Sequence, residues 1–111
     1  MKITIIIYSN DSETVWNAFR FAAASLGYDN EVTVFLLGRG IEMPGISTLE
    51  FDIEEQVDLF RENGGRLIGC GVCCDIRGET MPNLKAQLQC EIGSMQQMYE
   101  IVASADRVLT F

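Results

Sequence analysis

Near its N-terminus the 111-residue chain carries the stretch KITIIIY, residues 2–8, in which four of the seven residues are isoleucine. A run this apolar, without regular alternation of polar residues, is typical of a strand that is covered on both faces. The polar segment Ser9-Asn10-Asp11-Ser12 follows and offers helix caps, with Glu13 placed three residues after Asn10. The stretch therefore predicts a buried strand that leads directly into a helix.

Strands and helices alternate along the rest of the chain. The strands are indicated by short apolar runs, and the helices by apolar residues three and four positions apart behind a capping pair. The predicted strands span residues 2–8, 31–37, 66–70, 88–92 and 106–111. The predicted helices run from Val15 to Leu26, from Asp52 to Gly64, over 81–87, and onward from Ser94. Residues 38–50 contain three glycines and a proline, and they predict a loop.

This alternation predicts a mostly parallel sheet with helices on both of its faces. We expect an α/β fold, a three-layer sandwich around about five strands, formed by residues 1–111 as a single domain. The last helix has an apolar stripe that is expected to face the core: Met95, Met98, Tyr99 and Val102. Trp16 is expected to lie in the core or at a subunit interface.

The charge balance is acidic, with eight Lys and Arg against sixteen Asp and Glu, a net charge of −8. An acidic field repels phosphate backbones and anionic lipid surfaces, so we expect neither nucleic acid nor membranes as partners. The first apolar run is too short for a secretory signal, and no run reaches membrane length. We therefore expect a cytoplasmic protein, where clustered cysteines are more often reactive or metal-binding than disulfide-bonded.

Three of the four cysteines lie together in Cys70-Gly71-Val72-Cys73-Cys74, directly after the third predicted strand. Reactive groups gather at the carboxyl ends of parallel strands, and a thiol must be partly exposed and ionised to attack sulfur. We expect the strand exit to expose Cys70, and the amides of the turn together with Arg77 to stabilise its thiolate. Gly71 leaves room for another molecule to approach the sulfur. Between residues 61 and 78, three arginines and two acids give a local net charge of +1.

The Cys70-x-x-Cys73 spacing lets one thiol attack a species formed on the other. Cys73 is therefore the candidate resolving thiol, and Cys74 is an additional thiol with the same potential role. Each of the three is alternatively a small buried apolar residue, which is a common environment for free cysteine. Cys90 falls in a predicted strand and is expected to pack in the core.

Other kinds of chemistry fit the sequence less well. The four cysteines can supply the thiolates of a zinc or iron–sulfur site, but zinc modules usually pair two Cys-x-x-Cys knuckles and this chain has one. There is no phosphate-binding loop and no dinucleotide fingerprint after the first strand. The absence of histidine excludes Ser-His-Asp and Cys-His catalysis. We therefore expect neither a metal nor another cofactor.

Five motifs occur in a characteristic order along the whole chain. The isoleucine-rich first strand is followed by Ala18-Phe19-Arg20-Phe21-Ala22, and then by Val34-Phe35-Leu36-Leu37-Gly38-x-Gly40. The cysteine cluster continues as Cys70-Gly71-x-Cys73-x-x-x-Arg77-Gly78, and the chain ends in ADRVLTF, residues 105–111. In the order and spacing of these motifs, the chain resembles the DsrE/DsrF-like family of small sulfur-relay proteins, which includes the DsrE, TusD and YchN types.

The resemblance implies that Cys70, placed before Arg77-Gly78, holds a sulfane sulfur as a persulfide. The sulfur would come from a donor protein and pass to an acceptor protein, so that the chain acts as a sulfurtransferase of the carrier type. Family members assemble as homotrimers or hexamers, with the cysteine near a subunit contact. Two alternatives remain: a dithiol redox protein that cycles Cys70 and Cys73 through a disulfide, and a non-catalytic oligomeric interaction module.

Overall fold

The computed structural model describes residues 1–111 and contains one five-stranded sheet in which every pair of neighbours is parallel. The strand order is β4-β3-β2-β1-β5, so the isoleucine-rich first strand lies inside the sheet, between β2 and β5. The strands are β1 (Lys2–Ile7), β2 (Glu31–Leu36), β3 (Arg66–Cys70), β4 (Glu91–Gly93) and β5 (Arg107–Thr110). The predicted α/β fold with a parallel sheet of about five strands is confirmed.

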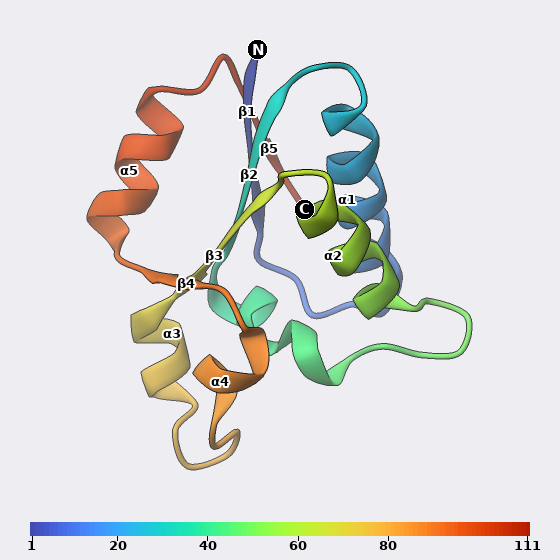
Figure 1. The fold of residues 1–111 in the computed structure, drawn as a ribbon. Coiled ribbons are helices and arrows are strands. Elements are labelled where there is room, and N and C mark those ends of the chain that lie inside the picture. The colour runs from blue at the N-terminus through green and yellow to red at the C-terminus, as the bar shows by residue number, and fades with distance from the viewer.

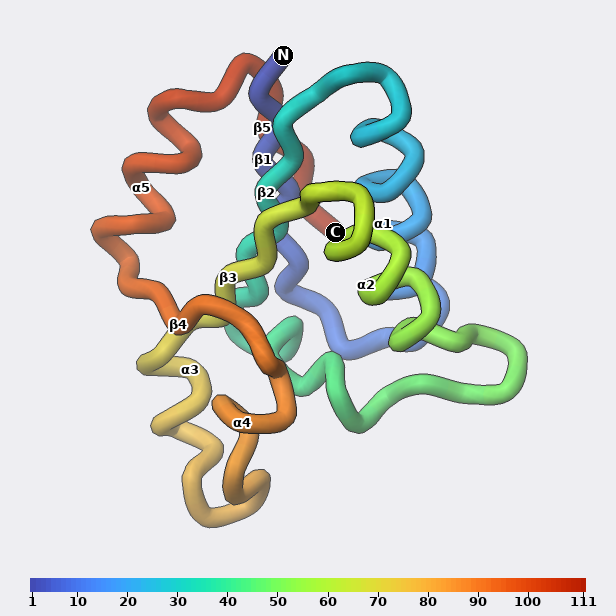
Figure 2. The backbone as a smooth tube through the Cα atoms, viewed as in Figure 1, coloured from blue at the N-terminus to red at the C-terminus, as the bar shows by residue number.

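The helices form the two outer layers and a group at one end of the sheet. They are α1 (Ser12–Leu26), α2 (Ile53–Glu62), α3 (Gly71–Ile76), α4 (Leu84–Leu88), α5 (Met95–Ala103) and the 3₁₀ segment η1 (Gly38–Gly45). In Figure 1, α1 and α2 lie side by side on one face of the sheet and α5 covers the other. Helices α3 and α4 lie beyond the carboxyl ends of the strands, where both contact η1 (Figure 2).

Side-chain caps begin the three longest helices. The Asp52 carboxylate accepts from the Glu55 N–H at 3.2 Å, and the Ser94 hydroxyl accepts from the Gln97 N–H at 3.2 Å, as predicted. For α1 the cap lies in the predicted segment, residues 9–12, but it is not the residue that pairs with Glu13 in sequence. Asp11, not Asn10, caps this helix, and its carboxylate accepts from the N–H of Thr14 at 3.0 Å.

The sheet divides the core into two unequal parts. On the side of α1 and α2, nineteen buried residues form one cluster that continues to the carboxyl end of the sheet. On the side of α5, the buried cluster contains only Phe35, Ile68 and Cys70. Met98 and Ile101 of α5 pack against these three residues, and no residue of α5 is itself fully buried. The face of the sheet under α5 is therefore thinly covered.

Several local predictions are wrong. Met98 of the expected inward stripe packs against the sheet, as predicted, but Met95 and Tyr99 are exposed, and Ile101 makes the second inward contact. The cysteine cluster continues into a helix, α3, where the sequence predicted a turn, and the predicted loop at 38–50 contains η1. Cys90 lies just before β4 and not within it. Helices as short as α3 and η1 leave little periodic signal in a sequence.

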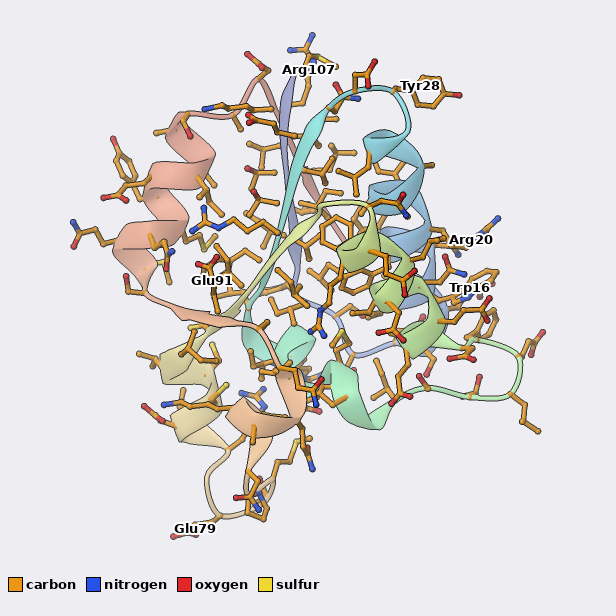
Figure 3. All side chains as sticks on the ribbon, in the orientation of Figure 1. Trp16, Arg20, Tyr28, Glu79, Glu91 and Arg107 are labelled. Atoms are coloured by element: carbon orange, nitrogen blue, oxygen red, sulfur yellow. The ribbon has the colours of Figure 1, made fainter.

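Trp16 lies on the outer side of α1, away from the cysteine-bearing end of the molecule (Figure 3). Its ring stacks obliquely on Phe51, with centroids 5.3 Å apart, and the guanidinium of Arg20 lies 4.4 Å from the ring centroid. Trp16 is thus partly buried at the edge of the larger core cluster. None of the helices combines the length and apolar character needed to cross a bilayer.

Gly40 lets η1 fit closely against the end of β1. A Cβ atom at this position would collide with the backbone carbonyl of Ile7, which cannot move without disturbing the sheet. At Gly45, five residues later in the same segment, a Cβ atom would meet nothing within 4 Å.

We predict that Gly40→Ala lowers the free energy of unfolding by about 1–3 kcal/mol, the usual cost of overpacking. Urea unfolding followed by circular dichroism measures this change. Gly45→Ala is the matched control and should stay within about 0.5 kcal/mol of the wild type. Equal stability of the two variants would contradict the tight contact between η1 and β1.

Candidate thiol site at the carboxyl edge of the sheet

The cysteine cluster lies at the carboxyl edge of the sheet, as predicted. Cys70 is the last residue of β3 and the N-cap of α3, and it is paired in register with Gly93 of β4. Leu36 of β2 pairs with Gly69 of β3, so the turn after β2 lies beside the turn after β3. This register brings Gly38 next to the first turn of α3.

Cys70 is buried, with only 3% of its surface exposed. It packs with Phe35 and Ile68 beneath Met98 and Ile101 of α5. The expectation that the strand exit exposes this thiol is wrong, because Cys70 belongs to a buried cluster against which α5 packs. The structure also shows no hydrogen bond between the Cys70 side chain and the amides of the following turn.

Cys73 is the partly exposed thiol of the pair, and it packs against both core clusters. The backbone N–H of Gly38 donates to its Sγ at 3.2 Å. Partial burial and a side-chain interaction with the Cys70 thiol raise the pKa of Cys73, while the Gly38 N–H and the positive charge of Arg77 act to lower it. The two thiols therefore form one interacting pair, with the stabilising contacts made to Cys73.

Arg77 is held near Cys73 by an ion pair. Its Nε donates to the Glu42 carboxylate at 2.7 Å, and its Nη1 donates to the Cys73 carbonyl at 3.1 Å. Asn10 also donates to Glu42, at 3.2 Å, so the loop after β1, the segment η1 and the helix α3 meet at this carboxylate. Hydrogen bonds from Arg77 and Asn10 hold the pKa of Glu42 below its usual value.

The local excess of arginine noted in the sequence is offset by carboxylates from other parts of the chain. Glu42 pairs with Arg77, and Glu91 of β4 (Figure 3) pairs with Arg66 through two hydrogen bonds of 2.9 Å. These acids lie outside the segment from which the positive charge was counted. The thiol pair thus lies beside a neutralised arginine and not in a broad positive field.

Cys74 and Cys90 are in different surroundings. Cys74 is buried in the larger core cluster, and burial raises the pKa of its thiol, while Lys85 acts to lower it. Cys90 packs at the edge of the same cluster, and burial raises its pKa to about 11. At both positions, as at Cys73, the raised pKa favours the neutral thiol at physiological pH.

Gly71 has a packing role at this edge. A Cβ atom on Gly71 would lie 3.1 Å from Cγ2 of Ile92, so the glycine allows α3 to begin close against β4. The space expected beside the sulfur is therefore occupied by a side chain of the protein itself.

All four cysteines are free thiols. No three Cys, Asp or Glu side chains are grouped closely enough to hold a metal ion. Cys74 is buried within the larger core cluster, whereas Cys73 packs against both clusters and Cys70 belongs to the smaller one. What the site offers chemically is a pair of interacting thiols, one buried and one partly exposed.

Two residues of the site, Gly38 and Glu42, were not identified as functional from the sequence. The backbone amide of Gly38 donates to Cys73, and the carboxylate of Glu42 accepts from Arg77; each contact joins residues 35 positions apart in the sequence. The only signal for Gly38 is its place directly after a buried strand, and its φ of +56° is a conformation that glycine adopts readily. Glu42 lacks any local pattern.

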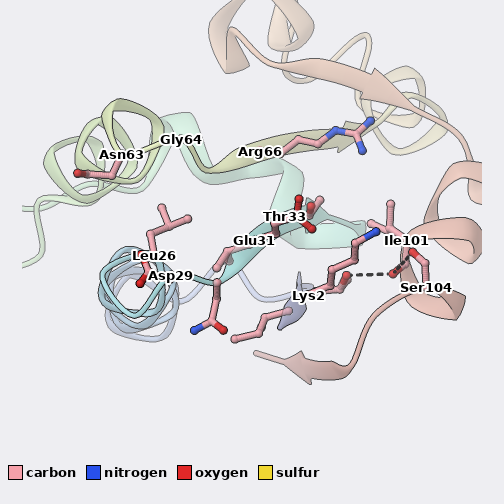
Figure 4. A pocket seen from close by; sticks show the side chains of 14 residues that line it. Lys2, Leu26, Asp29, Glu31, Thr33, Asn63, Gly64, Arg66, Ile101 and Ser104 are labelled. Atoms are coloured by element: carbon pink, nitrogen blue, oxygen red, sulfur yellow. Dashed lines mark hydrogen bonds between the residues drawn. The ribbon is translucent and has the colours of Figure 1, made fainter.

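The largest pocket is at the opposite end of the molecule, near the amino ends of β1, β2 and β3 (Figure 4). Its volume is about 590 Å³, and polar side chains such as Lys2, Glu31 and Arg66 line much of it. No cysteine borders this pocket. The thiol pair is therefore not part of a deep small-molecule cavity.

We predict that Arg77→Gln moves the alkylation of Cys73 to higher pH. Removing the positive charge takes away an influence that lowers the pKa of Cys73, so less of the reactive thiolate is present at a given pH. Iodoacetamide labelling across a pH series, resolved by peptide mass spectrometry, measures the shift. Arg66→Gln is the control and should leave the curve unshifted, since Arg66 pairs with Glu91 on the surface. An unshifted curve for Arg77→Gln would contradict the influence of Arg77 on the Cys73 thiol.

Comparison with known proteins places this arrangement in a family. An uncharacterized protein of Methanocaldococcus jannaschii, MJ0989, is 29% identical over 119 aligned positions that span the whole of both chains. The solved structure of a conserved protein of unknown function from Bacteroides thetaiotaomicron, BT1422, has the same fold, with a TM-score of 0.78 and 17% identity over 99% of this chain and 94% of that one. The model of the DsrE/DsrF-like family matches residues 1–111. The chain therefore belongs to the DsrE/DsrF-like family.

Proposed function

We propose that this protein is a sulfane-sulfur carrier that holds sulfur as a persulfide on Cys70 and passes it to the thiol of a partner protein. The family is generally associated with sulfur relay. The observation that carries the proposal is the pair of free, interacting thiols at the carboxyl edge of the sheet, Cys70 and Cys73.

The surroundings of Cys70 suit the storage of sulfane sulfur. A persulfide is lost when an exposed nucleophile attacks its sulfur–sulfur bond. Phe35 and Ile68 form a buried apolar cluster with Cys70, and Met98 of α5 packs against this cluster. In the proposed function, this site protects the sulfur from thiols of the reducing cytoplasm after the donor has delivered it and before the acceptor takes it.

The alternative of a dithiol redox protein is favoured by the same contact between the two thiols. Cys73 can attack Sγ of a Cys70 persulfide, which closes a Cys70–Cys73 disulfide and releases the outer sulfur as hydrosulfide. A carrier keeps this reaction slow, whereas a redox protein depends on the disulfide. The two functions therefore differ in whether the added sulfur stays on the protein.

The sulfur-loading experiment tests the proposal. After incubation with glutathione persulfide and brief treatment with cyanide, which removes exposed sulfane sulfur, the wild type should retain the mass of one sulfur atom per chain. Cys70→Ala should retain at least about tenfold less, because the protected site is gone. Intact-mass spectrometry gives the retained sulfur.

Cys74→Ala and Cys90→Ala are the matched controls, and both should retain sulfur at the level of the wild type. The assignment is wrong if Cys70→Ala retains as much sulfur as the wild type. Formation of a Cys70–Cys73 disulfide with no gain of sulfur would favour the dithiol alternative.

We further propose that the protein forms a homotrimer or hexamer through the apolar side made by α3, β4 and α5. Exposed apolar side chains lie on all three elements: Val72, Ile76, Ile92, Met95 and Tyr99. Figure 1 shows these elements in succession along one side of the molecule, and β4 is an edge strand with only three residues. Contact with a second copy would cover this surface beside the thiol pair.

Size-exclusion chromatography with light scattering tests this contact. Wild-type protein should elute as a trimer or hexamer, and Tyr99→Glu should shift it toward the monomer, because an acid would be buried against an apolar partner surface. Tyr28→Glu is the control, since Tyr28 is equally exposed at the far end of α1 (Figure 3). A monomeric wild type, or an unchanged Tyr99→Glu, would contradict the proposal.

A further inference from the structure

The two thiols of the pair differ in how a donor can reach them. Cys70 is covered by the sheet and by α5, and only 3% of its surface is exposed. Cys73 is partly exposed on the first turn of α3. A sulfur atom carried by another molecule therefore meets Cys73 before it can reach Cys70.

The contacts that stabilise negative charge are also made to Cys73. The Gly38 N–H points at its Sγ from 3.2 Å, and Arg77 is fixed nearby by its ion pair with Glu42. A backbone amide directed at a sulfur atom stabilises the thiolate that attacks or leaves during exchange. At Cys70 the structure shows no corresponding contact from the adjoining turn.

We propose that sulfur enters the protein at Cys73 and moves from there to Cys70, so that Cys73 is the receiving thiol and Cys70 the storage thiol. This inference rests on the proposed carrier function and adds the route by which the carrier is loaded. It assigns Gly38, through its backbone amide, as a positioning residue for Cys73.

The transfer balances without an oxidant or a reductant. In the first step the Cys73 thiolate attacks the outer sulfur of the donor persulfide; a new sulfur–sulfur bond forms on Cys73, the donor's bond breaks, and the donor leaves as a thiolate. In the second step the Cys70 thiolate attacks the outer sulfur on Cys73. The Cys70 persulfide forms, and the Cys73 thiolate is restored. Protons lost by the attacking thiols return through solvent to the leaving thiolates.

The proximity of the two thiols makes the second step intramolecular. Cys70 is the N-cap of α3 and Cys73 lies three residues later on its first turn, where it packs against the buried cluster that contains Cys70. Holding reactants together in this way replaces a bimolecular encounter by a local exchange. Burial of Cys70 then limits competing attack from solvent, because the packing around it must open locally before an outside nucleophile can reach the stored sulfur.

Initial rates of sulfur gain from glutathione persulfide test the route. Cys70→Ala should begin to gain sulfur at close to the rate of the wild type, and cyanide should remove that sulfur readily, since it lies on the partly exposed Cys73. Cys73→Ala should gain sulfur at least about tenfold more slowly, because the donor must wait for local opening around Cys70. Cys74→Ala is the control, because it makes the same substitution at a cysteine outside the thiol pair, and it should gain sulfur at the rate of the wild type.

A second measurement avoids dependence on the variants' folding. Peptide mapping of the wild type during loading should find the added sulfur on Cys73 first and on Cys70 later. Sulfur on Cys70 from the earliest time, or a Cys73→Ala variant that loads at the rate of the wild type, would overturn the route while leaving the carrier function intact. A wild type that gains no sulfur would instead overturn the carrier function itself.

Discussion

The parallel pairing of β2 with β3 is the constraint on which the site depends. Because Leu36 lies opposite Gly69, both strands end at the same level of the sheet, and the turns that follow them are forced together. Gly38 then lies where its amide can reach the sulfur of Cys73, although 35 positions separate the two residues. The apolar strands that make this sheet stable thus also determine which thiol receives a hydrogen bond.

The sheet and the position of the cysteine cluster could be predicted because both depend on local patterns. Runs such as residues 2–8 predict buried strands, and capping pairs such as Asp52 with Glu55 mark the start of helices. The cluster follows a strand, and in a parallel sheet that position is always the carboxyl edge. Its place in the fold therefore followed from the alternation of strands and helices alone.

The environment of each thiol could not be predicted, because it depends on elements distant in the sequence. Cys70 is buried with Phe35 and Ile68 under α5, which packs against them through Met98 of the predicted stripe and through Ile101, a residue that the stripe did not include. Arg77 was expected to serve the thiolate of Cys70, but Glu42 holds it beside Cys73. Neither contact leaves a pattern in the cysteine segment. The roles of Cys70, Cys73 and Arg77 in sulfur transfer remain predictions that the geometry now makes specific.

A carrier of sulfane sulfur must accept the sulfur readily and then protect it, and two thiols in different environments can divide these tasks. Here the partly exposed Cys73 would accept the sulfur and the buried Cys70 would protect it, and both lie within a single turn of α3. A crystal structure of the protein after loading with glutathione persulfide tests this account most directly. The account predicts an additional sulfur atom bonded to Sγ of Cys70, beneath α5 and against Phe35. Additional sulfur on Cys74 or Cys90, or a closed Cys70–Cys73 disulfide without additional sulfur, would contradict it.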